Sequence, residues 1–125
     1  MGLRTFGSTI KLNDFKDELL ALRYLGEDVD VQTEYGLIST ARAEVVHFTT
    51  TDGALIAERL GNTLVFQRAI QNEIRGSRDW SVGTFEEVPH ATATAPDGTM
   101  YQLTTPDESM EQIGAAMAAA GIAVD

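Results

Sequence analysis

The side chains of this sequence best suited to binding chemistry are aromatic rings and arginines in segments that we predict as strands and loops. Proteins that hold single-stranded nucleic acid stack bases on exposed rings, at about 1 to 3 kcal/mol per base, and follow the phosphate backbone with cations. Residues of both types recur along the chain, and the candidates are Tyr35, Arg42, Phe48, Arg59, Arg78 and Trp80.

The rings in that set have alternative roles in packing. Phe48 ends an apolar strand, which favours a place in the core. Trp80 has polar neighbours on both sides, so we expect it at a rim where it could either pack or stack a base. Tyr35 follows Glu34 in a predicted loop and is expected to be exposed. The predicted nucleic-acid-binding residues are therefore Tyr35, Arg42, Arg59, Arg78 and Trp80.

Two further arginines, Arg68 and Arg75, share one polar side of a predicted helix with Asn72. The same spacing describes the solvent-facing side of an amphipathic helix, and this is the favoured interpretation. In the fold predicted below, the helix also lies away from the usual ligand face. We therefore leave these residues out of the predicted interface.

The sequence predicts neither an enzyme nor a cofactor. A nucleophilic serine needs a neighbouring base, but His47 and His90 fall in a predicted strand and a proline-bounded loop, and no Gly-x-Ser-x-Gly motif is present. Glycine motifs for nucleotide phosphates are missing as well. The segment with the carboxylates Asp28, Asp30 and Glu34 lacks the glycine and the final glutamate of an EF-hand loop. We therefore expect it to be a solvated turn that binds no metal. There is no cysteine for disulfides or thiolate ligands.

The charge of the chain is strongly negative and unevenly distributed. The formal net charge is −10, from 9 basic and 19 acidic residues among 125. All the lysines and arginines lie between Arg4 and Arg78, where a similar number of acids opposes them, and residues 79–125 contain neither. The first part of the chain can therefore present a local basic stripe, whereas the second part is expected to repel phosphate or to face a basic partner.

The elements that would position these residues are mostly strands. Alternating hydrophobicity and turn signals predict strands over residues 19–25, 41–50, 54–60, 80–88 and 99–104. Asp52 and Gly53 are predicted to form a hairpin turn between the second and third of them. A helix is predicted over residues 63–75, with Asn62 or Thr63 as its cap and Gly76 at its end. Its predicted apolar stripe consists of Phe66, Ala69, Ile70 and Ile74. A second helix is predicted over residues 107–120, with a weakly apolar stripe of Met110, Ile113, Ala116, Met117 and Ala120. Residues 15–25 also suit a helix by propensity, but the abrupt stop at Gly26 favours a strand.

The element order β-β-β-α-β-β is that of an OB-fold, a small five-stranded Greek-key barrel. We predict a mainly β protein in which this barrel is closed, with Phe66 and Ile74 filling its base, and is followed by a C-terminal helix. One domain suits the length. The predicted parts are an N-terminal arm (1–14), the OB-like barrel (15–106), and a C-terminal helix and tail (107–125).

Hydropathy favours a protein outside the membrane. No apolar run approaches the roughly 18 residues typical of a membrane span, and the first residues lack the apolar segment of a secretory signal. Together with the missing cysteines, this favours the cytoplasm. The alanine-rich final helix could pack against a neighbouring copy, which would give a homo-oligomer.

Several short segments carry a resemblance to a known group of proteins. They are Thr33-Glu34-Tyr35-Gly36, residues 41–46, Leu64-Val65-Phe66-Gln67, Val82-Gly83 and residues 101–108. In this order the chain resembles small OB-fold-like proteins of actinobacterial bacteriophages. The resemblance implies single-stranded DNA binding in phage replication or recombination, within the cytoplasm of the infected bacterial host. The sequence departs from the group after Val82-Gly83, where Glu86 and Glu87 replace a basic stretch.

Two functions from different classes therefore remain open. The first is non-enzymatic binding of single-stranded DNA with little sequence preference. The second is a protein-binding module of the same fold, either a virion or assembly component or an acidic inhibitor of a host nucleic-acid enzyme. In the second case residues 79–125 would face a basic host or phage protein.

Overall fold

The computed structural model describes residues 11–34, 36–94 and 96–123. Within these residues a short 3-10 turn (Leu12–Phe15) precedes five strands and two helices, in the order β1 (Leu19–Thr33), β2 (Gly36–Thr51), β3 (Ala54–Val65), α1 (Arg68–Ile74), β4 (Ser81–Pro89), β5 (Thr99–Thr104) and α2 (Met110–Ala119). The predicted mainly β class is confirmed. Residues 1–10 of the predicted arm lie outside the described residues, and Leu12 near its end is buried.

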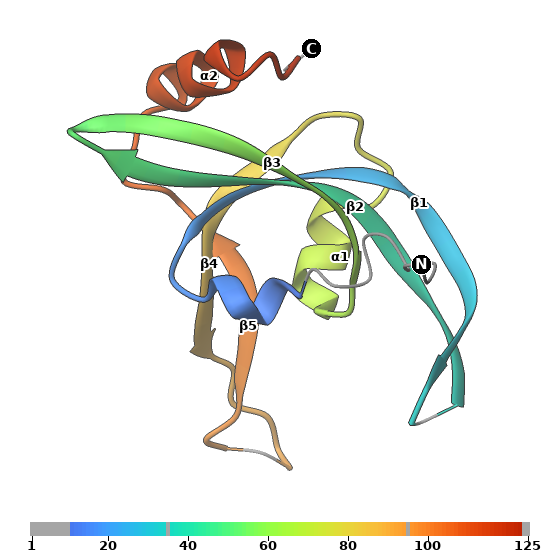
Figure 1. The fold of residues 1–125 in the computed structure, drawn as a ribbon. Helices are drawn as coiled ribbons and strands as arrows, with labels where there is room; N and C mark the ends of the chain where they lie inside the picture. Colours follow the sequence, from blue (N-terminus) through green and yellow to red (C-terminus); the bar gives the residue numbers. More distant parts are fainter. Residues whose placement is uncertain (1–10, 35, 95, 124–125) are drawn as a thin grey trace, which may run out of the picture.

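The five strands form one antiparallel sheet in the order β3-β2-β1-β4-β5. Over the described residues no ladder joins the edge strands β3 and β5, so the sheet is not closed and the predicted closed barrel is wrong. The reason lies in α1, which packs against both edge strands and against β1. Figure 1 shows the sheet curling around this helix. A helix therefore occupies the opening that a further strand pairing would need.

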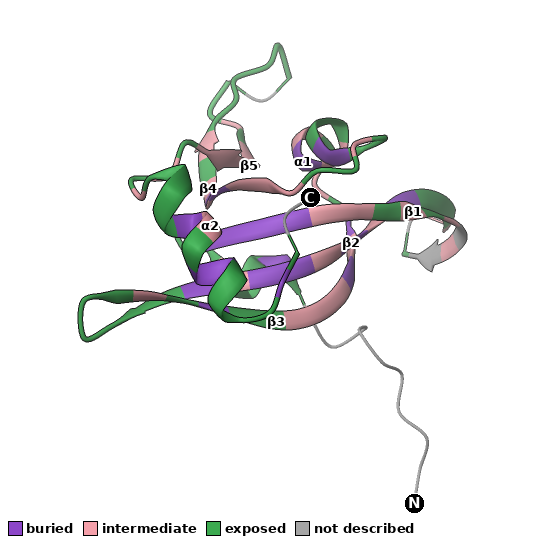
Figure 2. Cartoon of the chain, turned by 90° about the horizontal axis from the view of Figure 1, so that it is seen from above, coloured by how far each residue is buried: buried purple, intermediate pink, exposed green. Residues whose placement is uncertain are grey.

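The sheet carries a hydrophobic core on each side. On the inner face, which we define as the one towards α1, Leu20 and Leu22 of β1 pack with Phe85 and with Ile70 and Ile74 of the helix. The outer face, towards α2, has its own cluster of Leu19, Ala21, Val46, Phe48, Ala57, Ile113, Ala116, Met117 and Ile122. Buried stretches of strand lie beneath α2 in Figure 2. Phe48 is 3% exposed, which confirms its prediction as a core residue.

The predicted helix over residues 63–75 starts too early. β3 continues through Gly61, whose φ of +112° accompanies a register shift against β2. Thr63 and Val65 then pair with β2 and are buried. Because this segment belongs to the sheet, α1 begins only at Arg68, and the predicted cap by Asn62 or Thr63 is wrong.

The later part of the predicted helix is confirmed. Ile70 and Ile74 are 1% and 0% exposed and attach α1 to the inner core. Gly76 follows the helix with φ +80°, a conformation that glycine adopts without steric cost. Phe66 precedes the helix and is 52% exposed, so its predicted place in the base of a barrel is wrong.

Helix α2 covers the outer face and begins later than predicted. Ser109 caps it reciprocally with Gln112: the backbone N–H of Gln112 donates to Ser109 Oγ at 3.1 Å, and the N–H of Ser109 donates to Gln112 Oε1 at 3.0 Å. Met110 is 65% exposed and does not join the apolar stripe predicted for it. Ala120 is exposed as well. The middle of the predicted stripe is confirmed, since Ile113, Ala116 and Met117 are buried against the sheet.

Candidate functional site

Beside α2, the outer face carries a row of charged side chains across three strands. Arg23 of β1 lies opposite Glu44 of β2 in the ladder and donates from Nη2 to Glu44 Oε1 at 2.6 Å. Arg59 of β3 places its Nε 3.1 Å from Glu44 Oε2. The side chain of Glu44 is 16% exposed, against 52% for Arg59. One largely buried carboxylate therefore holds two arginines from the neighbouring strands.

Arg42 is held by a second set of contacts on β1 and β3. Its Nη2 and Nε donate to Asp28 Oδ2 at 2.6 and 3.1 Å, and its Nη1 donates to Asn62 Oδ1 at 2.6 Å. The hydrogen bond from Arg42 lowers the pKa of the Asp28 carboxyl below its ordinary value. Since three of its donors are engaged and its side chain is 31% exposed, Arg42 is more firmly fixed than Arg59.

Trp80, immediately before β4, joins this row. The guanidinium carbon of Arg23 lies 4.8 Å from the centroid of the indole ring, a distance at which a cation is attracted to the ring face. The indole Nε1 donates to the carbonyl of Ala123 at 2.9 Å. The half-buried ring also lines a hollow of about 210 Å³ against α2, together with Asp79, Val82, Met110, Ile113, Gly114 and Met117.

The structure brings together part of the interface that the sequence predicts. Arg42, Arg59 and Trp80 lie on one connected outer face, although they come from different strands. Arg78 is exposed in the segment before β4 and makes no recorded ion pair with the described residues. Tyr35 lies outside the described residues.

Sequence reasoning missed Arg23 and Glu44, which connect the members of this face. A signal for Arg23 was present, because it continues the alternation of Leu19 and Ala21 on the side of β1 opposite Leu20 and Leu22. Its pairing with Glu44 depends on the register between two long strands. We name this surface, made of Arg23, Arg42, Glu44, Arg59 and Trp80, the arginine face.

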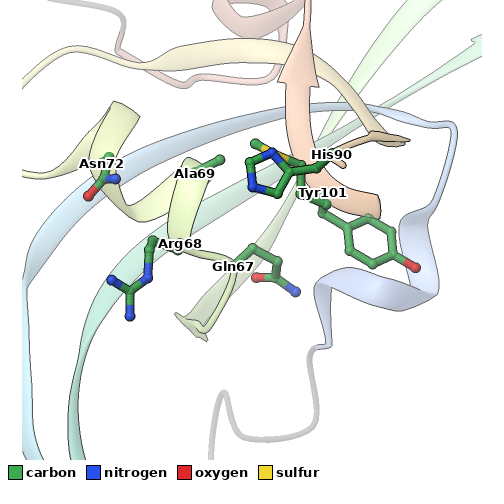
Figure 3. Close-up of a pocket in the computed structure, with 7 residues that line it drawn as sticks. Gln67, Arg68, Ala69, Asn72, His90 and Tyr101 are labelled. Carbon is green, nitrogen blue, oxygen red and sulfur yellow. The ribbon is translucent and has the colours of Figure 1, made fainter. Parts of the chain in front are cut away.

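A second set of hollows lies along the polar side of α1. One, of about 430 Å³, is lined by Gln67, Arg68, Ala69, Asn72, His90, Met100 and Tyr101. In Figure 3 His90 and Tyr101 lie on one side of the first helical turn, and the Arg68 and Asn72 side chains point to the other. The neighbouring hollow, of about 520 Å³, is lined by Glu27, Ser39, Arg68, Gln71, Asn72 and Arg75.

Part of the wall of the second hollow consists of side chains that already have partners. Arg75 donates to both oxygens of Glu27 at 2.9 and 3.0 Å. Gln71 donates to the carbonyl of Val65 at 2.6 Å and so ties α1 to the end of β3. The prediction that Arg68 and Arg75 lie on the solvent-facing side of the helix is confirmed, since both are exposed.

Acid is expected to weaken the contacts that join β1 to its neighbours. Hydrogen bonds from Arg42 lower the pKa of Asp28 from 3.8, and bonds from Arg75 and then Tyr24 lower that of Glu27 from 4.5. A carboxyl whose pKa is lower in the folded state stabilises the fold above its unfolded pKa and loses that effect as the pH falls through the folded pKa. We therefore expect the melting temperature to fall as the pH is lowered below about 4.

The Asp28→Asn variant tests the contribution of Asp28, with melting temperatures measured at about pH 6 and about pH 3. The variant should melt lower than the native chain at the higher pH and show a smaller further drop at the lower one. An identical drop in both proteins would show that the contact with Arg42 has no net effect on stability.

Comparison with known proteins identifies no relative of this chain. No protein-family model matches the chain, and neither the curated proteins nor the solved structures give a match. Among residues 11–34, 36–94 and 96–123, no group of three or more His, Asp or Glu side chains is placed to hold a metal ion. In the same part of the chain, no helix combines the length and apolarity needed to cross a membrane. The assignment of function therefore depends on the arginine face itself.

Proposed function

We propose that this chain is a non-enzymatic single-stranded DNA-binding protein and that the arginine face is its binding surface. The observation that carries the proposal is the meeting of Arg42, Arg59 and Trp80 on one side of the sheet. A flat aromatic ring beside cations is the combination that stacks bases and follows phosphates. As part of this proposal, the activity serves bacteriophage replication or recombination, which is the role that the resemblance of the sequence implies.

The same proposal includes an OB-like topology for the sheet. β1, β2 and β3 follow one another as hairpins, and β4 returns beside β1, giving the spatial order 4-1-2-3. This order is the one that defines a Greek key, from which OB barrels are built. The open edge between β3 and β5 is the departure from that barrel. On the outer face, α2 covers part of β1 to β3, and the arginine face beside it is the part left for an extended ligand.

The arginines of the arginine face differ in how far they are already engaged, and Arg78 lies two residues before Trp80 in the sequence. Arg59 is 52% exposed and engages Glu44 through Nε, which leaves terminal donors for a phosphate. Arg78 is exposed and has no recorded ion pair within the described residues. Arg42 is occupied by Asp28 and Asn62 and fixes the surface instead. With two phosphate contacts, the logarithm of the binding constant should fall with a slope of about −1.4 against log salt.

A titration with a labelled oligonucleotide tests this proposal. The native chain should bind at about 50 mM salt and roughly sevenfold more weakly at about 200 mM. Combining Arg78→Ala with Trp80→Ala should abolish binding, because it removes a free cation and the only tryptophan. Arg68→Ala is the matched control, since it removes an exposed arginine on α1 away from this face. No binding by the native chain at the lower salt would exclude the proposal.

The second candidate, a protein-binding module, is favoured by one observation on charge. Arg23, Arg42 and Arg59 are all paired with carboxylates, and residues 79–125 contain no lysine or arginine. A basic phage or host protein would meet this part of the chain without repulsion. Self-association through α2 would have to use its exposed side, because Ile113 and Met117 are buried on the sheet. A chain that binds no oligonucleotide but is retained by a basic protein surface would support this candidate.

A further inference from the structure

Gly114 lies inside α2, where nothing in the fold requires a glycine. A Cβ built at this position would meet no atom within 4 Å beyond its immediate neighbours, so close packing does not demand it. Its φ is not in the left-handed region that favours glycine. Glycine is also less favourable than alanine in the interior of a helix. The visible effect of Gly114 is that it keeps one wall of the hollow beside Trp80 free of a side chain.

The walls of that hollow are apolar except at one position. Val82, Ile113 and Met117 line it with the indole of Trp80, and Met110 contributes a flexible side chain that is 65% exposed. Rings and thioethers of this kind make favourable contacts with a flat aromatic ligand. The exception is Asp79, an exposed residue whose carboxylate accepts hydrogen bonds and cannot donate them.

One cation lies against the tryptophan that lines the hollow, and two more are connected to it through a shared carboxylate or by their place in the sequence. Arg23 lies over the Trp80 ring at 4.8 Å. Arg59 shares the carboxylate of Glu44 with Arg23, and Arg78 immediately precedes Asp79 in the sequence. A ligand with one flat ring and negative charges beside it matches this arrangement better than a neutral apolar side chain does.

We propose that the hollow between Trp80 and α2 receives one base of bound single-stranded DNA and that Asp79 selects a base carrying an exocyclic amino group. The inference rests on the proposed function and adds a base preference to it. Cytosine offers an N4 amino donor that a carboxylate can accept, whereas thymine presents the O4 acceptor, which a carboxylate repels. Preference for cytosine over thymine is therefore the signature of this site.

Oligo(dC) and oligo(dT) of equal length provide the first test. The native chain should bind oligo(dC) roughly tenfold more tightly at low salt, as expected for one charge-assisted hydrogen bond gained and one repulsion avoided. Asp79→Asn should bring the two affinities within about twofold, because an amide can donate as well as accept. Since Trp80 is the only tryptophan, its fluorescence should change on binding in the native chain.

Filling the hollow provides the second test. Gly114→Leu should weaken oligo(dC) binding about tenfold, because its side chain would stand in the space meant for the base. Gly114→Ala is the matched control: it adds only a methyl group, favours the helix, and should bind within about twofold of the native chain. Thermal unfolding of both variants checks that α2 stays folded.

The outcomes separate this inference from the function on which it rests. If the native chain binds neither oligonucleotide at low salt, the DNA-binding function and the base site are both wrong. If it binds both equally, or if folded Gly114→Leu binds like Gly114→Ala, the base site is wrong and the DNA-binding function stands. If the Trp80 fluorescence responds to a basic peptide and to neither oligonucleotide, the occupant is a protein.

Discussion

Replacing Phe85 by alanine is expected to lower the free energy of unfolding by about 4 kcal/mol. Phe85 is 0% exposed, and its ring stacks on that of Tyr101 with centroids 4.9 Å apart and planes at 7°. Its backbone N–H donates to the carbonyl of Glu18 at 2.9 Å, which ties β4 to the start of β1. The truncated side chain would leave a cavity between β4, β5 and the inner core.

Urea unfolding measures this loss, and Tyr101→Phe is its matched control. That variant keeps the stacked ring and removes only the hydroxyl, for which the described residues provide no recorded hydrogen bond. It should therefore unfold within about 1 kcal/mol of the native chain. A Phe85→Ala variant as stable as Tyr101→Phe would mean that the ring stack and the inner core contribute little.

Gly83→Ala is expected to be the next most damaging substitution, with a loss of roughly 3 kcal/mol. A Cβ at this position would lie 2.6 Å from the carbonyl oxygen of Thr104 and 2.8 Å from Cβ of Leu103. Both residues belong to β5, and the adjoining Thr84 pairs with Thr104 in the ladder. The strands cannot move apart without breaking that ladder, so the clash must strain the sheet.

Thermal unfolding of Gly83→Ala should show a melting temperature about 10 °C below that of the native chain. The matched control is Gly114→Ala, where an added Cβ meets nothing and the helix gains roughly 0.5 to 1 kcal/mol. The two variants make the same chemical change in opposite packing environments. Equal melting temperatures for both would contradict the close approach of β4 and β5 at Gly83.

Local signals in the sequence predicted the elements whose structure is determined locally. The turn at Asp52 and Gly53 is confirmed, and both residues have the positive φ of a tight hairpin turn. β5 has the predicted bounds, and the stripe of Ile70 and Ile74 places α1 correctly on the core. These features depend on residues a few positions apart, so short sequence patterns are enough to predict them.

The errors arose where distant segments decide the outcome. Gly61 reads as a strand end, but the pairing of β3 with β2 accommodates it through a register shift and continues to Val65. The sheet would close if β3 paired with β5, but α1 packs against β5 instead. No local sequence pattern distinguishes these two arrangements. The arginine face was only partly predictable for the same reason. Arg23, Glu44 and Arg59 come together only through the registers of three paired strands.

The alternation of β1 between the two cores has a consequence for how this chain tolerates insertions and deletions. Leu20 and Leu22 point to one side, and Leu19 and Ala21 point to the other. Loss of a single residue from this stretch would exchange the sides of all those that follow it, so both hydrophobic layers would fail together. Loss of two residues would shorten the strand but keep each side chain in its own layer. Length changes in this strand should therefore be accepted in even steps and rejected in odd ones.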